Sequence, residues 1–206
     1  MSLTFDRWQR LMASLGLGPS EPTFEALAAA YTEPQRHYHN RTHIADCLAL
    51  LDEVRSAAAE PAEVELALWF HDAVYNTRAF DNEARSADWA ATFLKEAGAE
   101  EAVAARVAGH IRATEHDAGP APGDAALVVD IDLSILGRPP AAFDAFDQAI
   151  RKEYAWVPGF LYRRTRRQIL EGFLDRPVLY TTPALRERFE APARANLERA
   201  LGRLAA

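Results

Sequence analysis

The chain has 206 residues, of which 49% are hydrophobic and 26% are charged, a balance typical of a globular protein with one core. Its net charge of −7 argues against a nucleic-acid polymer as partner, because affinity for the phosphate backbone requires an excess of positive charge. The only cysteine, Cys47, excludes an internal disulfide and any zinc site with two thiolates, so we expect a bound metal to have nitrogen and oxygen ligands.

The N-terminal segment "MSLTFDRWQRLMASLG" mixes charged residues into an amphipathic pattern and lacks the apolar core of a signal peptide. No stretch approaches the roughly 18 uninterrupted apolar residues of a membrane span. We therefore expect no membrane partner, and a cytoplasmic location follows as the default.

Apolar residues recur at three- and four-residue spacing nearly throughout the chain, which predicts helices. In chain order, the expected helices cover residues 5–15, 24–31, 44–54, 64–75, 81–94, 103–114, 143–154, 162–174 and 183–204. The segment 64–75 is apolar nearly all round, as expected of a central helix that others cover. "AGPAPG", residues 118–123, is the clearest loop.

The segment "ALVVDIDLSI", residues 126–135, is the only one whose β-branched residues are compatible with a strand. No second alternating segment is available to pair with it, so we predict a helix here as well. The expected fold is all-α, a single helical bundle over residues 1–206. Helices within 1–31 and a last helix over 183–204 are expected to pack on its core.

The stretch "LALWFHDAVYN" places two ionisable side chains, His71 and Asp72, inside a run of large apolar residues. Burying both costs several kcal/mol unless a neighbouring group compensates. Imidazole and carboxylate groups hold divalent metals without thiolates, and His43 and the aspartates of "VVDIDLSILG" supply more of them. Asp132 has only apolar residues three and four positions away, whereas Asp130 has slightly more polar ones. Asp132 is therefore expected to need a buried cation more.

The order His43, then His71-Asp72, then Asp132 resembles the H…HD…D signature of the HD superfamily of metal-dependent phosphohydrolases. Over about residues 31–197, the chain also resembles a bacterial branch of that superfamily whose substrate is undefined. The motifs that carry this resemblance are "RHYHNRTHI", "WFHDAVYN", "DNEARSA", "ATEHD", "DIDLSILG", "IRKEYAWVP" and "RPVLYTT". The resemblance implies an all-α fold of HD-domain type with a metal between core helices. It also implies hydrolysis of a phosphomonoester such as a nucleotide.

We therefore expect one divalent ion, which would lower the pKa of its bound water and so supply the nucleophile. The four expected ligands are His43, His71, Asp72 and Asp132. Mn, Co, Mg, Ni, Fe and Zn are all compatible with these ligand types. The expected partner is a small phosphorylated molecule, and a homodimer is left open.

A hydrolase also needs groups that orient the water and protonate the leaving group. Asp81 and Glu83 follow the His-Asp pair by about one loop, and with Asp72 they are the expected catalytic residues. The alternative is that Asp81 and Glu83 only satisfy free N–H groups at the start of a helix. The sequence supports the two interpretations equally.

A phosphate on the ion needs a second positive or hydrogen-bonding group opposite the metal. The expected substrate-binding residues are Arg36, His39, Asn40, His116 and Arg166. Asn40 is equally suited to cap the helix that carries His43. His116 belongs to the family motif "ATEHD". Arg166 shares a face with apolar residues, where a salt bridge to a structural carboxylate is the stronger alternative.

Two other functions remain open. One is a two-metal HD enzyme with other chemistry, for which His110 and His116 would supply further ligands. The other is an HD-fold module that binds or senses a nucleotide without turnover. The intact set of four ligands argues against the second, since a sensor has no need of a metal.

Overall fold

The computed structural model describes residues 3–115 and 121–205. Within these ranges every regular element is a helix and none is a strand, which confirms the all-α prediction. The chain divides into two compact units, Met1–Asp132 and Leu133–Ala206. One domain over 1–206 stays a prediction. In the described part of the chain, no helix is both long and apolar enough to cross a membrane.

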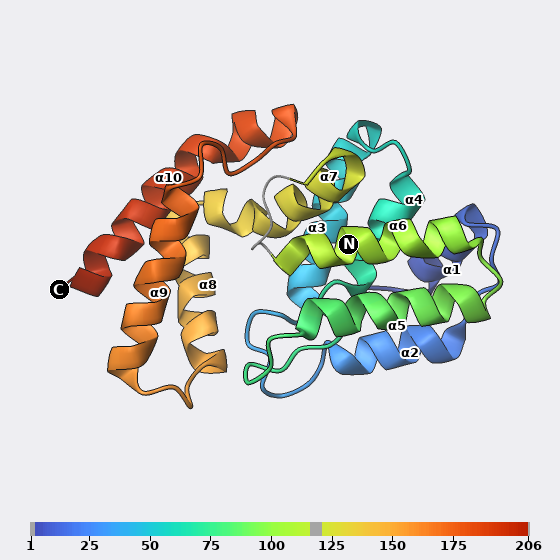
Figure 1. The fold of residues 1–206 in the computed structure, drawn as a ribbon, viewed down its shortest axis with the longest axis horizontal. Coiled ribbons are helices and arrows are strands. Elements are labelled where there is room, and N and C mark those ends of the chain that lie inside the picture. The colour runs from blue at the N-terminus through green and yellow to red at the C-terminus, as the bar shows by residue number, and fades with distance from the viewer. Residues whose placement is uncertain (1–2, 116–120, 206) are drawn as a thin grey trace. The chain divides into compact units, whose positions relative to one another are not determined.

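The first unit is a group of helices that runs from α1 to α7 (Figure 1). Its elements are α1 (Phe5–Ser14), α2 (Glu21–Ala30), α3 (Arg41–Val54), α4 (Pro61–Phe70), α5 (Asn82–Glu96), α6 (Glu101–Arg112) and α7 (Gly123–Asp132), with short 3₁₀ turns at Arg55–Ala57 and Ala113–Glu115. Helix α4 packs against α1, α3, α5, α6 and α7, and its residues 66–70 are fully buried. This explains why its sequence is apolar on every side.

The central helix ends earlier than its apolar pattern indicated. We predicted a helix over 64–75, but α4 stops before His71, and both His71 and Asp72 lie in the turn that follows. A distant side chain stabilises this turn: the guanidinium of Arg36 donates to the carbonyl oxygens of Asp72 and Ala73 at 2.6 and 3.0 Å. Because these carbonyls already have donors, they need no helical N–H partner.

Buried ion pairs tie α4 to its neighbours. Arg7 of α1 donates to Glu65 of α4 at 2.8 Å and to both carboxylate oxygens of Asp52 on α3 at 2.8 and 2.9 Å. Glu63 of α4 accepts two hydrogen bonds from Arg106 of α6, at 2.6 and 2.8 Å. Since Arg7, Glu63 and Glu65 are buried, each charge depends on its partner. These pairs hold α4, and therefore the turn at its end, in a defined position.

The second unit contains the 3₁₀ turn η3 (Leu133–Gly137) and the helices α8 (Pro140–Glu153), α9 (Gly159–Leu174) and α10 (Pro183–Ala205). Residues 126–135 are thus helical, as predicted, and end in η3. Helix α10 packs against both η3 and α9 (Figure 1). Two buried side chains secure η3: the hydroxyl of Tyr180 donates to the Leu133 carbonyl at 2.8 Å, and the Asn196 amide donates to the Leu136 carbonyl at 2.8 Å.

Gly137, at the end of η3, allows the close approach of α10. A Cβ atom there would lie 2.6 Å from the Cβ and 2.7 Å from the carbonyl oxygen of Phe189. Because the second of these is backbone, we expect Gly137→Ala to lower the free energy of unfolding by about 1–3 kcal/mol. Chemical denaturation measures this. The control is Gly172→Ala on α9, where a Cβ meets nothing within 4 Å, and an equal loss in both variants would contradict the packing account.

Candidate metal centre

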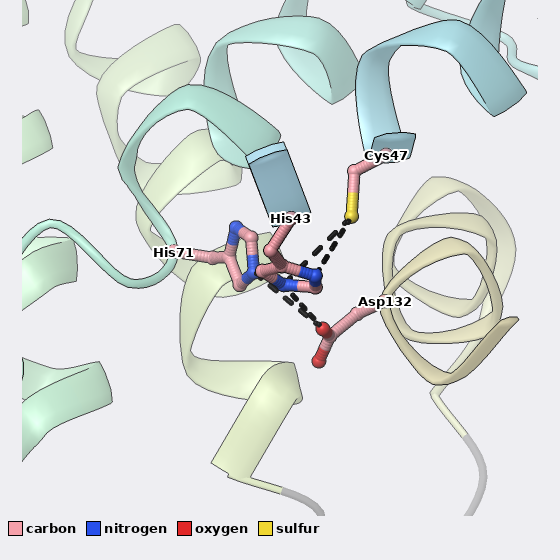
Figure 2. Close-up of side chains that lie close together, drawn as sticks. All are labelled: His43, Cys47, His71 and Asp132. Carbon is pink, nitrogen blue, oxygen red and sulfur yellow. Dashed lines mark hydrogen bonds and ion pairs between the residues drawn. The ribbon is translucent and has the colours of Figure 1, made fainter. Parts of the chain in front are cut away.

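Three segments of the first unit bring the four predicted ligands together. His43 lies in the first turn of α3, and Asn40 fixes the start of that helix by accepting a backbone N–H hydrogen bond at 2.9 Å. His71 and Asp72 follow the end of α4, and Asp132 is the last residue of α7. Figure 2 shows His43, His71 and Asp132 pointing toward one another from these segments.

The potential ligand atoms are close to one another. His43 Nε2 lies 3.1 Å from both His71 Nε2 and Asp132 Oδ1. Asp72 Oδ2 lies 3.4 Å from His43 Nε2 and 3.2 Å from His71 Nε2, and Asp132 Oδ1 lies 3.5 Å from His71 Nε2. Ligands that bind one ion at about 2.1 Å are themselves about 3.0–3.5 Å apart. These side chains therefore have the spacing of ligands to a single metal ion.

Two features of this cluster show that it needs a positive charge, from a proton or a metal, between its side chains. His71 Nδ1 lies 3.0 Å from the carbonyl oxygen of Leu68, which can only accept, so in the neutral imidazole Nδ1 carries the proton and Nε2 presents a lone pair. Asp72 Oδ2 is buried and accepts no hydrogen bond from the described residues. A lone pair and a carboxylate oxygen that face each other inside a protein repel unless a proton or a metal lies between them.

Without a metal, protons would supply that charge. Burial by itself lowers the pKa of His71, but the neighbouring carboxylates, Asp72 first, raise this pKa well above its usual value. Burial also lowers the pKa of His43, and the adjacent thiol, phenol and carboxylates outweigh it in the same way. Burial raises the pKa of Asp72, but the imidazoles of His71 and His39 hold it well below its usual value. A metal that binds here must displace protons from the imidazoles.

Metal affinity is accordingly expected to rise with pH. Because the pKa values of His43 and His71 are raised, the protonated imidazoles stabilise the metal-free fold below their usual pKa of about 6.5. This contribution to the free energy of unfolding is lost as the pH rises through the raised pKa values. Over the same window the dissociation constant of Zn²⁺ or Co²⁺ should fall by up to about tenfold per pH unit for each proton displaced. Thermal unfolding with and without metal, from below the usual imidazole pKa to above neutrality, measures the effect. A metal-induced shift that does not change with pH would contradict it.

The structure adds two side chains that the sequence reasoning left out. Cys47 Sγ lies 3.8 Å from each ring nitrogen of His43. Four residues, His43, Cys47, His71 and Asp132, each offer one potential ligand atom, and these atoms all lie within 4.8 Å of one another. Such a group could hold a metal ion. The expectation of nitrogen and oxygen ligands alone thus overlooked a thiol. Tyr38 places its ring centroid 4.7 Å from that of His43, and burial raises the pKa of its hydroxyl, which therefore stays protonated.

Arg36 is 6% exposed, and its donors face protein oxygens. These acceptors are the carboxylate of Glu33 and the carbonyl groups of His39, Asp72 and Ala73. The guanidinium also lies 5.3 and 5.4 Å from the ring centroids of Tyr31 and Tyr75. Such contacts make Arg36 a positioning residue for the turn that carries Asp72. Its contact with a substrate stays a prediction.

The residues just before α3 adjoin the cluster. The ring of His39 lies 4.3 Å from that of Tyr75 and 6.0 Å from that of His43, measured between centroids. Asn40 fulfils the capping role that we considered as its alternative, and its amide nitrogen donates to the His37 carbonyl at 3.0 Å. Substrate binding by His39 and Asn40 stays a prediction.

The other predicted site residues are Asp81 and Glu83 at the start of α5, Arg166 of the second unit and His116. Asp81 stands at the start of α5, exposed, and its side chain makes no capping hydrogen bond, while Glu83 lies half-buried in the first turn. A catalytic role for either stays a prediction. In the second unit, buried Arg166 donates from Nε and Nη2 to Asp147 Oδ1 at 3.1 and 2.9 Å, the structural salt bridge considered as its alternative. His116 lies outside the described residues.

Comparisons with protein-family models, with curated proteins and with solved structures found no match to this chain. The resemblance to the HD superfamily therefore rests on the order and context of the motifs. The candidate centre rests on its own geometry, a buried set of imidazole, carboxylate and thiol groups that could hold a metal ion.

Proposed function

We propose that this protein is a metal-dependent phosphohydrolase that cleaves a phosphomonoester in the cytoplasm, with nucleotides as the substrate class by resemblance. The observation that carries the proposal is the convergence of two imidazoles and two carboxylates, from three separate segments, to atom separations of 3.1–3.5 Å. A structural core has no reason to collect four such groups, since each costs free energy to bury. The proposed cofactor is one divalent ion held by His43, His71, Asp72 and Asp132.

The protein's own groups prepare the site. When bound, a divalent ion supplies an activated water and polarises a phosphoryl oxygen. The Leu68 carbonyl holds His71 in the tautomer whose Nε2 can ligate, a role that second-shell acceptors commonly have. Arg36 holds the carbonyl groups of Asp72 and Ala73, and with them the turn that carries the Asp72 side chain. Asp81 and Glu83 are the proposed groups for water orientation and leaving-group protonation.

A phosphatase screen tests the proposal. Metal-free protein is supplied separately with Mn²⁺, Co²⁺, Mg²⁺, Ni²⁺ and Zn²⁺ and offered a panel of nucleotides and other phosphomonoesters. We expect phosphate release that requires one of the metals and stops when a chelator is added. Tight metal and nucleotide binding without any phosphate release would contradict the enzyme proposal and favour a nucleotide-binding module.

A further inference from the structure

The chain's only thiol lies against the candidate metal centre. Cys47 is 2% exposed and stands four residues after His43 on α3, so the two side chains share one face of the helix. Figure 2 shows the sulfur pointing toward the His43 ring, which His71 and Asp132 approach from other segments. The thiol is therefore directed toward ionisable groups that the metal proposal already uses.

The contact between Cys47 and His43 is not a well-aligned hydrogen bond. Sγ lies 3.8 Å from both Nδ1 and Nε2, and because it is equally far from the two nitrogens it is in line with neither lone pair. The sulfur is thus free to direct its own lone pairs elsewhere. Independently of the thiol, Asp72 Oδ2 accepts no hydrogen bond from the described residues, and the Nε2 lone pair of His71 faces the same cluster. Both observations indicate a cation in this cluster, and Cys47 Sγ lies within 4.8 Å of potential ligand atoms of His43, His71 and Asp132.

We propose that Cys47 Sγ is itself a ligand of the ion, so that the centre has mixed nitrogen, oxygen and sulfur ligands and selects Zn²⁺, Co²⁺ or Fe²⁺ over Mg²⁺ and Mn²⁺. With metal–sulfur and metal–nitrogen distances of about 2.3 and 2.1 Å, neighbouring S and N ligands of an ion with five ligands are about 3.1–3.8 Å apart. The Sγ–Nε2 distance of 3.8 Å is at the end of this range, but Sγ is equally far from Nδ1, so the Cys47 side chain must turn toward the Nε2 side of the ring to reach the ion. Coordination forms a sulfur–metal bond, and the thiol proton passes to solvent. Thiolate ligands favour the softer ions of this set.

This inference rests on the metal-binding part of the proposed function and not on hydrolysis. The test is a titration of metal-free protein with Co²⁺, whose visible absorption reports coordination and whose sulfur-to-cobalt charge-transfer band in the near ultraviolet reports a thiolate ligand. Because the chain has one cysteine, any such band belongs to Cys47. We expect the band to saturate with one equivalent of Co²⁺ together with the visible bands.

Two variants complete the test. Cys47→Ser should keep the visible bands and lose the charge-transfer band. It should also lower the preference for Zn²⁺ over Mn²⁺ in competition by at least about tenfold, because the loss of even an outer-shell partner of a metal changes affinity by that factor. Cys47→Ala should give the same spectral change and the same change in metal preference, which excludes an effect of the serine hydroxyl. Far-ultraviolet circular dichroism checks that both variants fold. Visible bands without a charge-transfer band in the wild-type protein would overturn the role of Cys47 alone. No Co²⁺ binding at all would overturn both this role and the metal centre.

Discussion

Asp72→Ala is expected to lose both metal binding and hydrolysis while the metal-free protein still folds. The side chain supplies one of two carboxylates in the cluster, and its Oδ2 lies 3.2 and 3.4 Å from the two imidazole nitrogens. Without it the remaining groups carry less negative charge to balance a divalent ion. At a metal concentration one hundred times the wild-type dissociation constant, the wild-type protein gains about 2.7 kcal/mol of stability, and the variant should gain almost none.

The metal-free stability should change less than this. Asp72 is partly accessible, with 15% of its side chain exposed, and its buried oxygen accepts no hydrogen bond from the described residues. The expected cost is the lost attraction between Asp72 and the imidazoles of His71 and His43, for which Asp132 remains as a second carboxylate. Metal content, thermal unfolding with and without metal, and phosphate release measure the three effects separately.

The matched control for this substitution is Asp46→Ala. Asp46 is an exposed aspartate on α3, the helix that carries His43. It should retain full metal content and the full metal-induced stabilisation. Retained turnover and one equivalent of metal in Asp72→Ala would show that the chemistry lies elsewhere. Equal losses in both variants would indicate a general effect of removing negative charge.

Arg36→Ala is expected to have the largest effect on the fold among these substitutions. The guanidinium is the donor for the carbonyl groups of His39, Asp72 and Ala73, and each buried carbonyl left without a donor costs about 1–3 kcal/mol. We expect a total loss of about 3–5 kcal/mol in the free energy of unfolding, as for other buried charges whose network is broken. Metal affinity should fall as well, because the turn that carries Asp72 loses its anchor.

Two further variants separate this role from substrate binding. Arg36→Lys keeps the charge but lacks the planar fork that reaches several oxygens, so it should recover only part of the stability. Arg10→Ala removes an exposed arginine from α1 and should change stability by no more than about 0.5 kcal/mol. Denaturation and metal titration measure these effects. If Arg36→Ala kept wild-type stability and metal affinity but raised KM for a phosphorylated substrate, the predicted substrate contact would hold and the positioning role would be wrong.

Local patterns in the sequence were sufficient for most of the helices. The spacing of Phe5, Trp8, Leu11 and Met12 predicted α1, and Gly16 follows its end with a φ of +71°, a conformation that glycine adopts without strain. Asn40 was recognised as a cap for α3, and it does accept the hydrogen bond of a first-turn N–H. Such features depend on residues within one or two turns of each other, so they can be read without knowing the fold.

The identity of the candidate ligands also followed from local chemistry, but their burial did not. The free-energy cost of burying His71 and Asp72 in an apolar run predicted a compensating charge, and the structure brings His43 and Asp132 to them. Apolar neighbours were a poor guide to which aspartate is more buried. Asp130 is 1% exposed, whereas 16% of the Asp132 side chain is exposed.

The tertiary structure alone decided where α4 ends and which other groups reach the cluster. The apolar run continues past Phe70, yet α4 ends there, and Arg36, 36 residues before Asp72, donates to carbonyl groups of the turn that follows. The four-residue spacing of Cys47 from His43 placed both on one helical face, yet nothing in α3 indicates that this face meets the end of α4. Hydrophobic periodicity is a property of neighbouring residues, whereas a metal centre depends on backbone partners and packing between segments far apart in the chain.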